Sequence, residues 1–176
     1  MNKKKLFNIL GFYLCWWLSI YGANSENYFL GISVLLFYMV VHFIFISYNY
    51  IEYYYIFICF ILGFSIDTIL LNFNYIHYKG YLSEHFKLAP FWVVCLWVSF
   101  GLSIFHSFSF LRKKYLYTMI LGMISGPLIY YSCSRLEIIS FSVNQKNILI
   151  GISILWSVLL PVYVFIADFL FYKYEK

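Results

Sequence analysis

One run of sequence decides the fold: Cys59-Phe60-Ile61-Leu62-Gly63-Phe64-Ser65-Ile66-Asp67-Thr68-Ile69-Leu70-Leu71. It is apolar except for one carboxylate in its interior. A bare carboxylate in the hydrocarbon core of a membrane costs at least about 2.5 to 3.5 kcal/mol, so Asp67 needs a partner, a proton or water. Four members of the run recur every four residues: Cys59, Gly63, Asp67 and Leu71. This spacing predicts one helical stripe that faces a neighbouring helix and not lipid.

The composition places the whole chain in a membrane. Of its 176 residues, 64% are hydrophobic and 11% are charged, whereas a water-soluble domain has about 25% charged residues. The net charge of +5 comes from short clusters at the ends of apolar segments, and an extended basic face that would suit nucleic acid is absent from the sequence. The predicted partner is therefore the lipid bilayer, and nucleic acid is excluded.

Six apolar segments predict an all-α, polytopic membrane protein, a bundle of six transmembrane helices in a single domain of residues 1–176. Segments of about 20 residues suffice to cross the ~30 Å hydrocarbon core. The predicted helices cover residues 6–23, 28–47, 54–73, 91–110, 115–133 and 147–172. In the first, small residues recur every four positions, which favours a retained, packed helix over a cleaved signal peptide.

The fifth predicted helix contains Gly122 and Gly126 at GxxxG spacing, followed by Pro127. Glycines at this spacing let two helix backbones approach closely, and a proline frees a backbone carbonyl one turn earlier. We therefore expect the fourth and fifth helices to pack tightly and to kink.

The positive charges predict the orientation. Eight Lys and Arg residues lie on the side of the two termini and of residues 112–114, and four lie on the side of the two longer loops. Because cytoplasmic loops carry the excess of Lys and Arg, both termini are expected in the cytoplasm and the longer loops outside, in a bacterial inner membrane.

No cofactor is expected from the sequence. The four cysteines are isolated, as packing residues are. His77, Glu84 and His85 share one loop, but their spacing matches no standard zinc site. Nucleotide-binding fingerprints and hydrolase motifs are absent from the sequence.

Asp67 is the first candidate polar centre. Arg135, just beyond the fifth helix, has a side chain long enough to reach it. Such a pair would keep the carboxylate ionised and tie the third and fifth helices together, which is the favoured interpretation. A substrate or proton site and an unpaired, protonated Asp67 stay open as alternatives. Trp92 and Trp97 are expected in the outer interfacial belt and the packing beneath it.

A second candidate set consists of His42, His106 and Asp168, each four to five residues from the inner end of its helix. Two histidines and one carboxylate at one depth could hold a divalent metal. The three residues come from different helices without a local spacing rule, so independent interfacial residues are the favoured interpretation, and no metal site is predicted.

Short patterns along nearly the whole chain resemble one family: Gly63-x-x-x-Asp67, Ala89-Pro90-Phe91-Trp92 with Leu96-Trp97, His106-Ser107, and Gly126-Pro127-Leu128-Ile129-Tyr130 with Arg135-Leu136. They are similar to a bacterial family of small multi-pass inner-membrane proteins, domain of unknown function 2878. The resemblance implies no established activity or catalytic residue. It implies a gene neighbourhood shared with lipid-modifying enzymes.

Three functions are open from the sequence. The favoured one is a non-catalytic or accessory membrane component linked to envelope lipid metabolism. The second is a small transporter or flippase-like carrier that uses Asp67 and works as a homodimer or with another membrane protein. The third is an intramembrane enzyme that uses His42, His106 and Asp168.

Overall fold

The structure is a computed structural model that describes residues 3–47, 49–81 and 87–174. Its elements, in chain order, are α1 (Lys3–Asn24), α2 (Phe29–Val41), the π-helix η1 (His42–Ile46), α3 (Tyr50–Asn72), β1 (Ile76–Tyr78), α4 (Phe91–Gly101), the 3₁₀ helix η2 (Ser109–Leu111), α5 (Tyr115–Arg135), β2 (Ile139–Phe141) and α6 (Gln145–Tyr174). The all-α class is confirmed. Among the described residues, five helices are long and apolar enough to cross a membrane: α1, α2 continued by η1, α3, α5 and α6.

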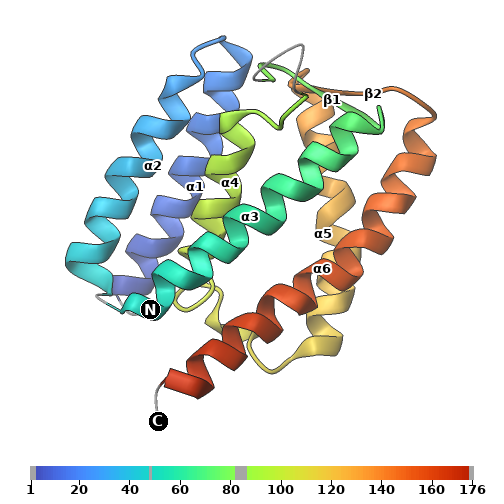
Figure 1. Ribbon diagram of the computed structural model, residues 1–176. Coiled ribbons are helices and arrows are strands. Elements are labelled where there is room, and N and C mark those ends of the chain that lie inside the picture. Colours follow the sequence, from blue (N-terminus) through green and yellow to red (C-terminus); the bar gives the residue numbers. More distant parts are fainter. Residues whose placement is uncertain (1–2, 48, 82–86, 175–176) are drawn as a thin grey trace.

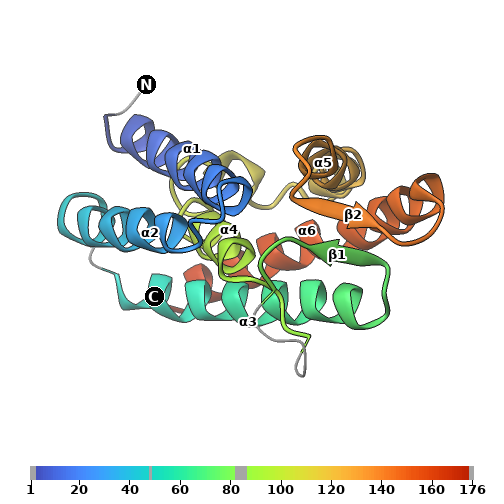
Figure 2. The ribbon, with the colours of Figure 1, turned by 90° about the horizontal axis from the view of Figure 1, so that it is seen from above.

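The helices form two groups joined through α3. Helix α4 lies at the centre of the first group and contacts α1, α2 and α3 (Figures 1 and 2). Helices α5 and α6 form the second group, and α3 also contacts α6. The outer faces of the long helices carry many exposed large apolar side chains, such as Phe37, Phe57 and Ile154. Apolar outer faces of this kind suit lipid and not water.

The predicted stripe on α3 is confirmed. All four of its members are buried, and three of them, Cys59, Gly63 and Asp67, lie against residues of α4. A Cβ atom on Gly63 would overlap the ring of Trp97, so the glycine is what allows the tryptophan to lie directly against the α3 backbone. This close approach brings the Trp97 ring to the level of Asp67, one turn further along α3.

The expectation that the glycines of the fifth helix pack against the fourth is wrong. Gly122 and Gly126 lie against Trp156 of α6: a Cβ on Gly122 would overlap its backbone carbonyl, and one on Gly126 would overlap its ring. The glycine face of α5 is thus used for α6. Helix α5 continues through Pro127 to Arg135.

The expected fourth helix of residues 91–110 is also wrong, because α4 ends at Gly101 and turns follow it. The reason is a side chain from α1. Asn8 is fully buried, donates from Nδ2 to the carbonyl of Leu102 at 2.9 Å, and accepts from the backbone N–H of Ser107 at 3.2 Å. One amide thereby satisfies backbone groups that a longer helix would have satisfied internally.

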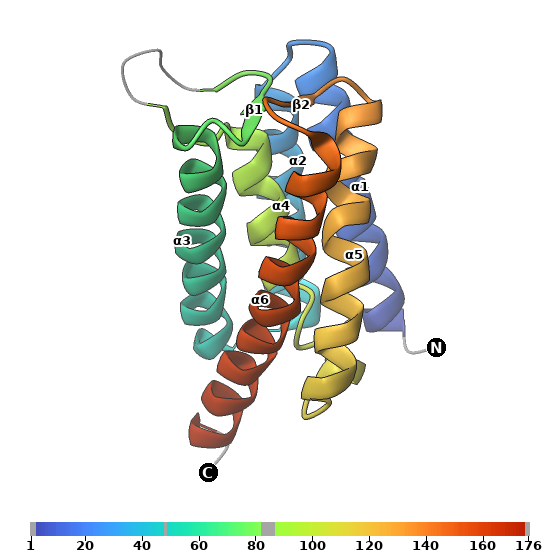
Figure 3. The same ribbon diagram turned by 90° about the vertical axis from the view of Figure 1, so that its right-hand side faces the viewer.

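The two ends of the bundle differ. At one end, β1 and β2 pair antiparallel, with His77 opposite Ser140, and so join the two longer loops (Figure 3). The start of α1 and the end of α6 lie at the opposite end. The amino-terminal segment meets the turns after α4 there, where Lys5 Nζ donates to Ser109 Oγ at 3.3 Å.

Candidate functional site

The first buried polar centre is built on Asp67, which is 2% exposed. Its Oδ1 accepts hydrogen bonds from the hydroxyls of Tyr78 at 2.7 Å and Tyr130 at 2.6 Å, and its Oδ2 accepts one from Nε1 of Trp97 at 2.6 Å. The donors come from β1, α5 and α4. We call these four residues the Asp67 centre. One carboxylate of α3 thus joins three other elements.

All three donors are neutral groups. Hydrogen bonds to an ionised acceptor are stronger than bonds between neutral groups, and three of them replace much of the hydration that the carboxylate loses on burial. Tyr78 lies in β1, outside the long helices, and burial raises the pKa of its phenol well above the usual range. Its hydroxyl therefore stays protonated and remains a donor.

The prediction that Arg135 pairs with Asp67 is wrong. Arg135 is exposed at the end of α5, and the Asp67 oxygens are occupied by the two tyrosines and the tryptophan. The hydroxyl of Tyr130, on the same helix but more than one turn deeper, already occupies Oδ1. A buried neutral donor reaches the carboxylate without the desolvation that a guanidinium would have to undergo.

A cavity of about 90 Å³ adjoins the Asp67 centre. Its walls are almost wholly apolar and aromatic, and they comprise Phe12, Trp16, Asp67, Tyr78, Trp92, Val93, Leu96, Trp97, Phe100, Ile129, Tyr130, Cys133, Ile139 and Trp156. The half-buried members come from α1, α4 and α5, whereas the strand residues are buried. The exposure pattern indicates an opening sideways between α1 and α5, toward the surroundings of the bundle.

One residue of the cavity wall has a polar atom without a partner. Nε1 of Trp156 is buried and makes no hydrogen bond within the described part of the chain. The Trp156 ring stacks on Trp97 with ring centres 5.4 Å apart, which fixes its orientation. A buried N–H without an acceptor costs about 1 to 3 kcal/mol, and a bound molecule that offers an acceptor would recover that energy.

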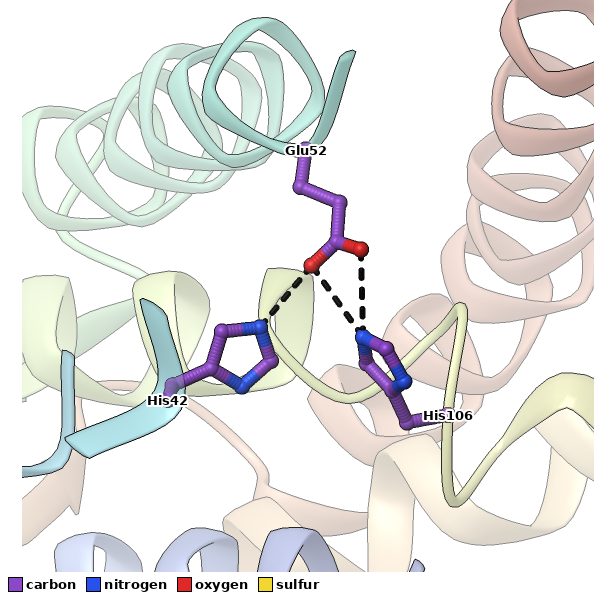
Figure 4. Close-up of side chains that lie close together, drawn as sticks. All are labelled: His42, Glu52 and His106. Carbon is purple, nitrogen blue, oxygen red and sulfur yellow. Dashed lines mark hydrogen bonds and ion pairs between the residues drawn. The ribbon is translucent and has the colours of Figure 1, made fainter. Parts of the chain in front are cut away.

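The second buried polar centre consists of His42, Glu52 and His106, which we call the Glu52 centre (Figure 4). Nε2 of His42 lies 2.8 Å from Oε2 of Glu52. Nε2 of His106 lies 3.1 Å from both carboxylate oxygens, and the hydroxyl of Ser47 donates to Oε1 at 2.6 Å. His42 and Glu52 are buried, and His106 is half-buried.

Local irregularities bring these groups together. His42 begins the π-helix η1, a widened turn of the kind that often occurs at functional sites. Glu52 lies in the first turn of α3, and His106 lies in the turns that replace the expected second half of the fourth helix. The interruption of α4 therefore positions one member of the Glu52 centre.

The favoured interpretation of His42, His106 and Asp168 as independent residues is wrong for the two histidines, and it holds for Asp168, which does not join them. The two histidines meet, but their carboxylate is Glu52. Asp168 accepts from Arg112 Nε at 2.9 Å and from the backbone N–H of Lys113 at 2.8 Å. Asp168 is thus paired with the charge of Arg112 and holds the turn before α5 in place. It takes no part in the Glu52 centre.

Sequence reasoning missed Glu52, Tyr78, Tyr130 and Trp156 as site residues, and it assigned Trp97 to the interfacial belt and the packing beneath it. Glu52 was assigned to a connection two residues before the expected helix, so its burial was not foreseen. The two tyrosines are among 19 in the chain, and nothing in their spacing distinguishes them. The lone Asp67 was itself the available signal, because a buried carboxylate requires donors around it.

The fold and the two centres define a class: a small all-helical protein with five helices fit to cross a membrane and with buried polar groups between them. The chain belongs to the family described as protein of unknown function (DUF2878), whose model matches residues 5–162. The predicted membership of domain of unknown function 2878 is thereby confirmed. No curated protein and no solved structure matches the chain.

Proposed function

We propose that the protein is a non-catalytic component of membrane lipid metabolism that takes one end of a lipid-like molecule into the cavity beside the Asp67 centre. The observation that carries the proposal is an aromatic cavity whose wall includes Trp156, a residue with a buried, unpartnered N–H. Apolar walls with one directed polar group are the pattern of small-molecule sites. The ligand is an amphiphile with a hydrogen-bond acceptor, such as a carbonyl or hydroxyl oxygen.

The size of the cavity limits what enters it. A volume of about 90 Å³ is well below the roughly 300 to 1,000 Å³ of pockets that enclose a whole small molecule, so only the terminal part of a molecule fits. The rest would extend past the half-buried rim residues Phe12 and Ile129 toward the acyl chains of the bilayer. A lateral opening suits a ligand that arrives from the membrane.

The membrane in question is the bacterial inner membrane, with both termini in the cytoplasm. Two observations support this orientation. The start of α1 and the end of α6 lie at the same end of the bundle, and this end carries most of the Lys and Arg residues. A homodimer or a complex with another membrane protein would use the exposed apolar helix faces.

Within this function, Asp67 has a structural role. Its three neutral donors hold α3, α4, α5 and β1 around the cavity, and the donors leave at most one lone-pair position for anything else. The alternative, a carrier in which Asp67 binds a cation or a proton, draws support from the place of Asp67 in the cavity wall. The same three donors favour the structural role over the carrier.

The test uses a fatty acid that carries a diazirine at its methyl end, together with a second probe that carries the diazirine beside the carboxyl group. The purified protein in lipid nanodiscs is illuminated with each probe, and the labelled residues are identified by peptide mass spectrometry. We expect one of the probes to label Trp156 or Trp97, both of which are buried.

Two variants of α5 supply the control. Ile129→Trp fills the rim of the cavity, whereas Leu128→Trp places the same side chain on the exposed face of the same helix. Labelling of Trp156 and Trp97 should disappear in Ile129→Trp and persist in Leu128→Trp. Labelling confined to exposed positions in the unaltered protein, or unaffected by Ile129→Trp, would exclude ligand entry into the cavity.

A further inference from the structure

We propose that the Glu52 centre is a binding site for a divalent metal ion of the zinc type, with Nε2 of His42, Nε2 of His106 and the Glu52 carboxylate as ligands. This site lies at the opposite end of α3 from the Asp67 centre. It is independent of the cavity and of the proposed lipid ligand.

The ligand set fits such an ion. Two imidazoles and one carboxylate are a recurrent set for zinc and for non-haem iron. Among the described residues, His42, Glu52 and His106 form a group that could surround a metal ion. Their ligand atoms all lie within 4.8 Å of one another. Ligand atoms that share one tetrahedral zinc lie about 3.3 Å apart. The nitrogen-to-oxygen distances of 2.8 and 3.1 Å therefore need to widen by only a few tenths of an ångström.

The contact between His106 and Glu52 supports a shared site. Nε2 of His106 is 3.1 Å from both oxygens of the carboxylate, so it favours neither oxygen as a hydrogen-bond acceptor. An ion between the ring and the carboxylate would use this arrangement directly, because a carboxylate can bind a metal through both oxygens.

The charge at the site favours a cation. Glu52 is 5% exposed, and His42 is not exposed at all. The groups that contact the carboxylate are two imidazoles and the Ser47 hydroxyl, none of which carries a fixed positive charge. Burying a carboxylate without a counter-charge is costly, and a divalent ion supplies that charge.

The three ligands are not equal. The second nitrogen of a metal-binding histidine normally donates to an acceptor. Nδ1 of His42 instead lies 3.4 Å from Nδ2 of Asn8. The Asn8 amide cannot turn over, because Nδ2 donates to the Leu102 carbonyl and Oδ1 accepts from the Ser107 N–H. Lack of this second contact weakens metal binding by about 10- to 100-fold, so we expect His42 to be the weakest ligand.

The experiment measures zinc bound to the purified full-length protein, carried on a tag without histidine. The protein is stripped with a chelator, incubated with Zn²⁺, freed of excess ion and analysed by inductively coupled plasma mass spectrometry. We expect about one zinc per chain. Glu52→Gln and His106→Gln should bring the ratio close to zero, whereas the control His77→Gln, at an exposed histidine of β1, should leave it unchanged.

A second measurement needs no variant, so it holds even where Glu52→Gln fails to fold. Diethyl pyrocarbonate modifies accessible imidazole nitrogens, and Zn²⁺ should protect His106 but not His77 in the unaltered protein. The proposal is overturned if the protein retains no zinc, if zinc survives in folded Glu52→Gln, or if Zn²⁺ leaves the modification of His106 unchanged. Neither result affects the proposed lipid site.

Discussion

Replacing Asp67 with Asn is the perturbation whose consequence the structure defines most closely. The Trp97 N–H can only donate, so the amide oxygen must take the place of Oδ2. The new NH₂ group then faces the hydroxyls of Tyr78 and Tyr130, which both donate in the native protein. Three hydrogen bonds to a charged acceptor become neutral or are lost, at about 1 kcal/mol each, so the free energy of unfolding should fall by about 3 kcal/mol.

The assay is equilibrium unfolding in detergent micelles, followed by tryptophan fluorescence. Arg135→Gln is the matched control, because Arg135 is the partner that charge alone would select and it is exposed in the structure. It should change the unfolding free energy by less than about 0.5 kcal/mol. An effect of Arg135→Gln as large as that of Asp67→Asn, or no effect of Asp67→Asn, would refute the described geometry of the Asp67 centre.

Three further changes test the packing and the anchors, each by the same unfolding measurement. Gly126→Ala should lower the free energy of unfolding by about 1 to 3 kcal/mol because its methyl overlaps a tryptophan ring of α6. The control Gly151→Ala has nothing within 4 Å of the new methyl and should be neutral or stabilising. Equal effects of the two variants would contradict the α5–α6 contact. Asp168→Asn should cost about 2 kcal/mol through loss of the ion pair with Arg112, and an unchanged stability would mean that this pair is not formed. Asn8→Asp puts an oxygen where the native NH₂ group donates to the carbonyl of Leu102, and it should lower the free energy of unfolding by at least about 3 kcal/mol. An unchanged stability would exclude Asn8 as the cause of the helix interruption.

Hydrophobicity and small-residue spacing predicted the helical class, the approximate limits of five long helices and the buried stripe of α3. These features depend on local sequence alone, because each apolar segment is long enough to cross a bilayer. They did not predict where α4 ends. Residues 102–110 include Leu, Ile and three Phe and carry no helix-breaking Gly or Pro, and the interruption depends on Asn8, more than 90 residues earlier in the chain.

Of the candidate site, the sequence predicted the buried Asp67 and the two histidines, but not the residues that contact them. A lone Asp67 in an apolar run requires hydrogen-bond donors, but the chain offers many neutral donors, and only the tertiary packing selects Tyr78, Trp97 and Tyr130. The rule that opposite charges pair favoured Arg135 and was misleading here. The two histidines were correctly set at one depth. Their carboxylate was missed because α3 begins at Tyr50, four residues before the expected helix.

The most direct test of the central claim is a high-resolution structure of the protein in nanodiscs prepared with its native lipids. We expect elongated density that enters between α1 and α5 and ends within hydrogen-bond distance of Trp156 Nε1, with Asp67 bound by Tyr78, Tyr130 and Trp97. An empty cavity closed to the bilayer, or Asp67 paired with Arg135, would contradict the account.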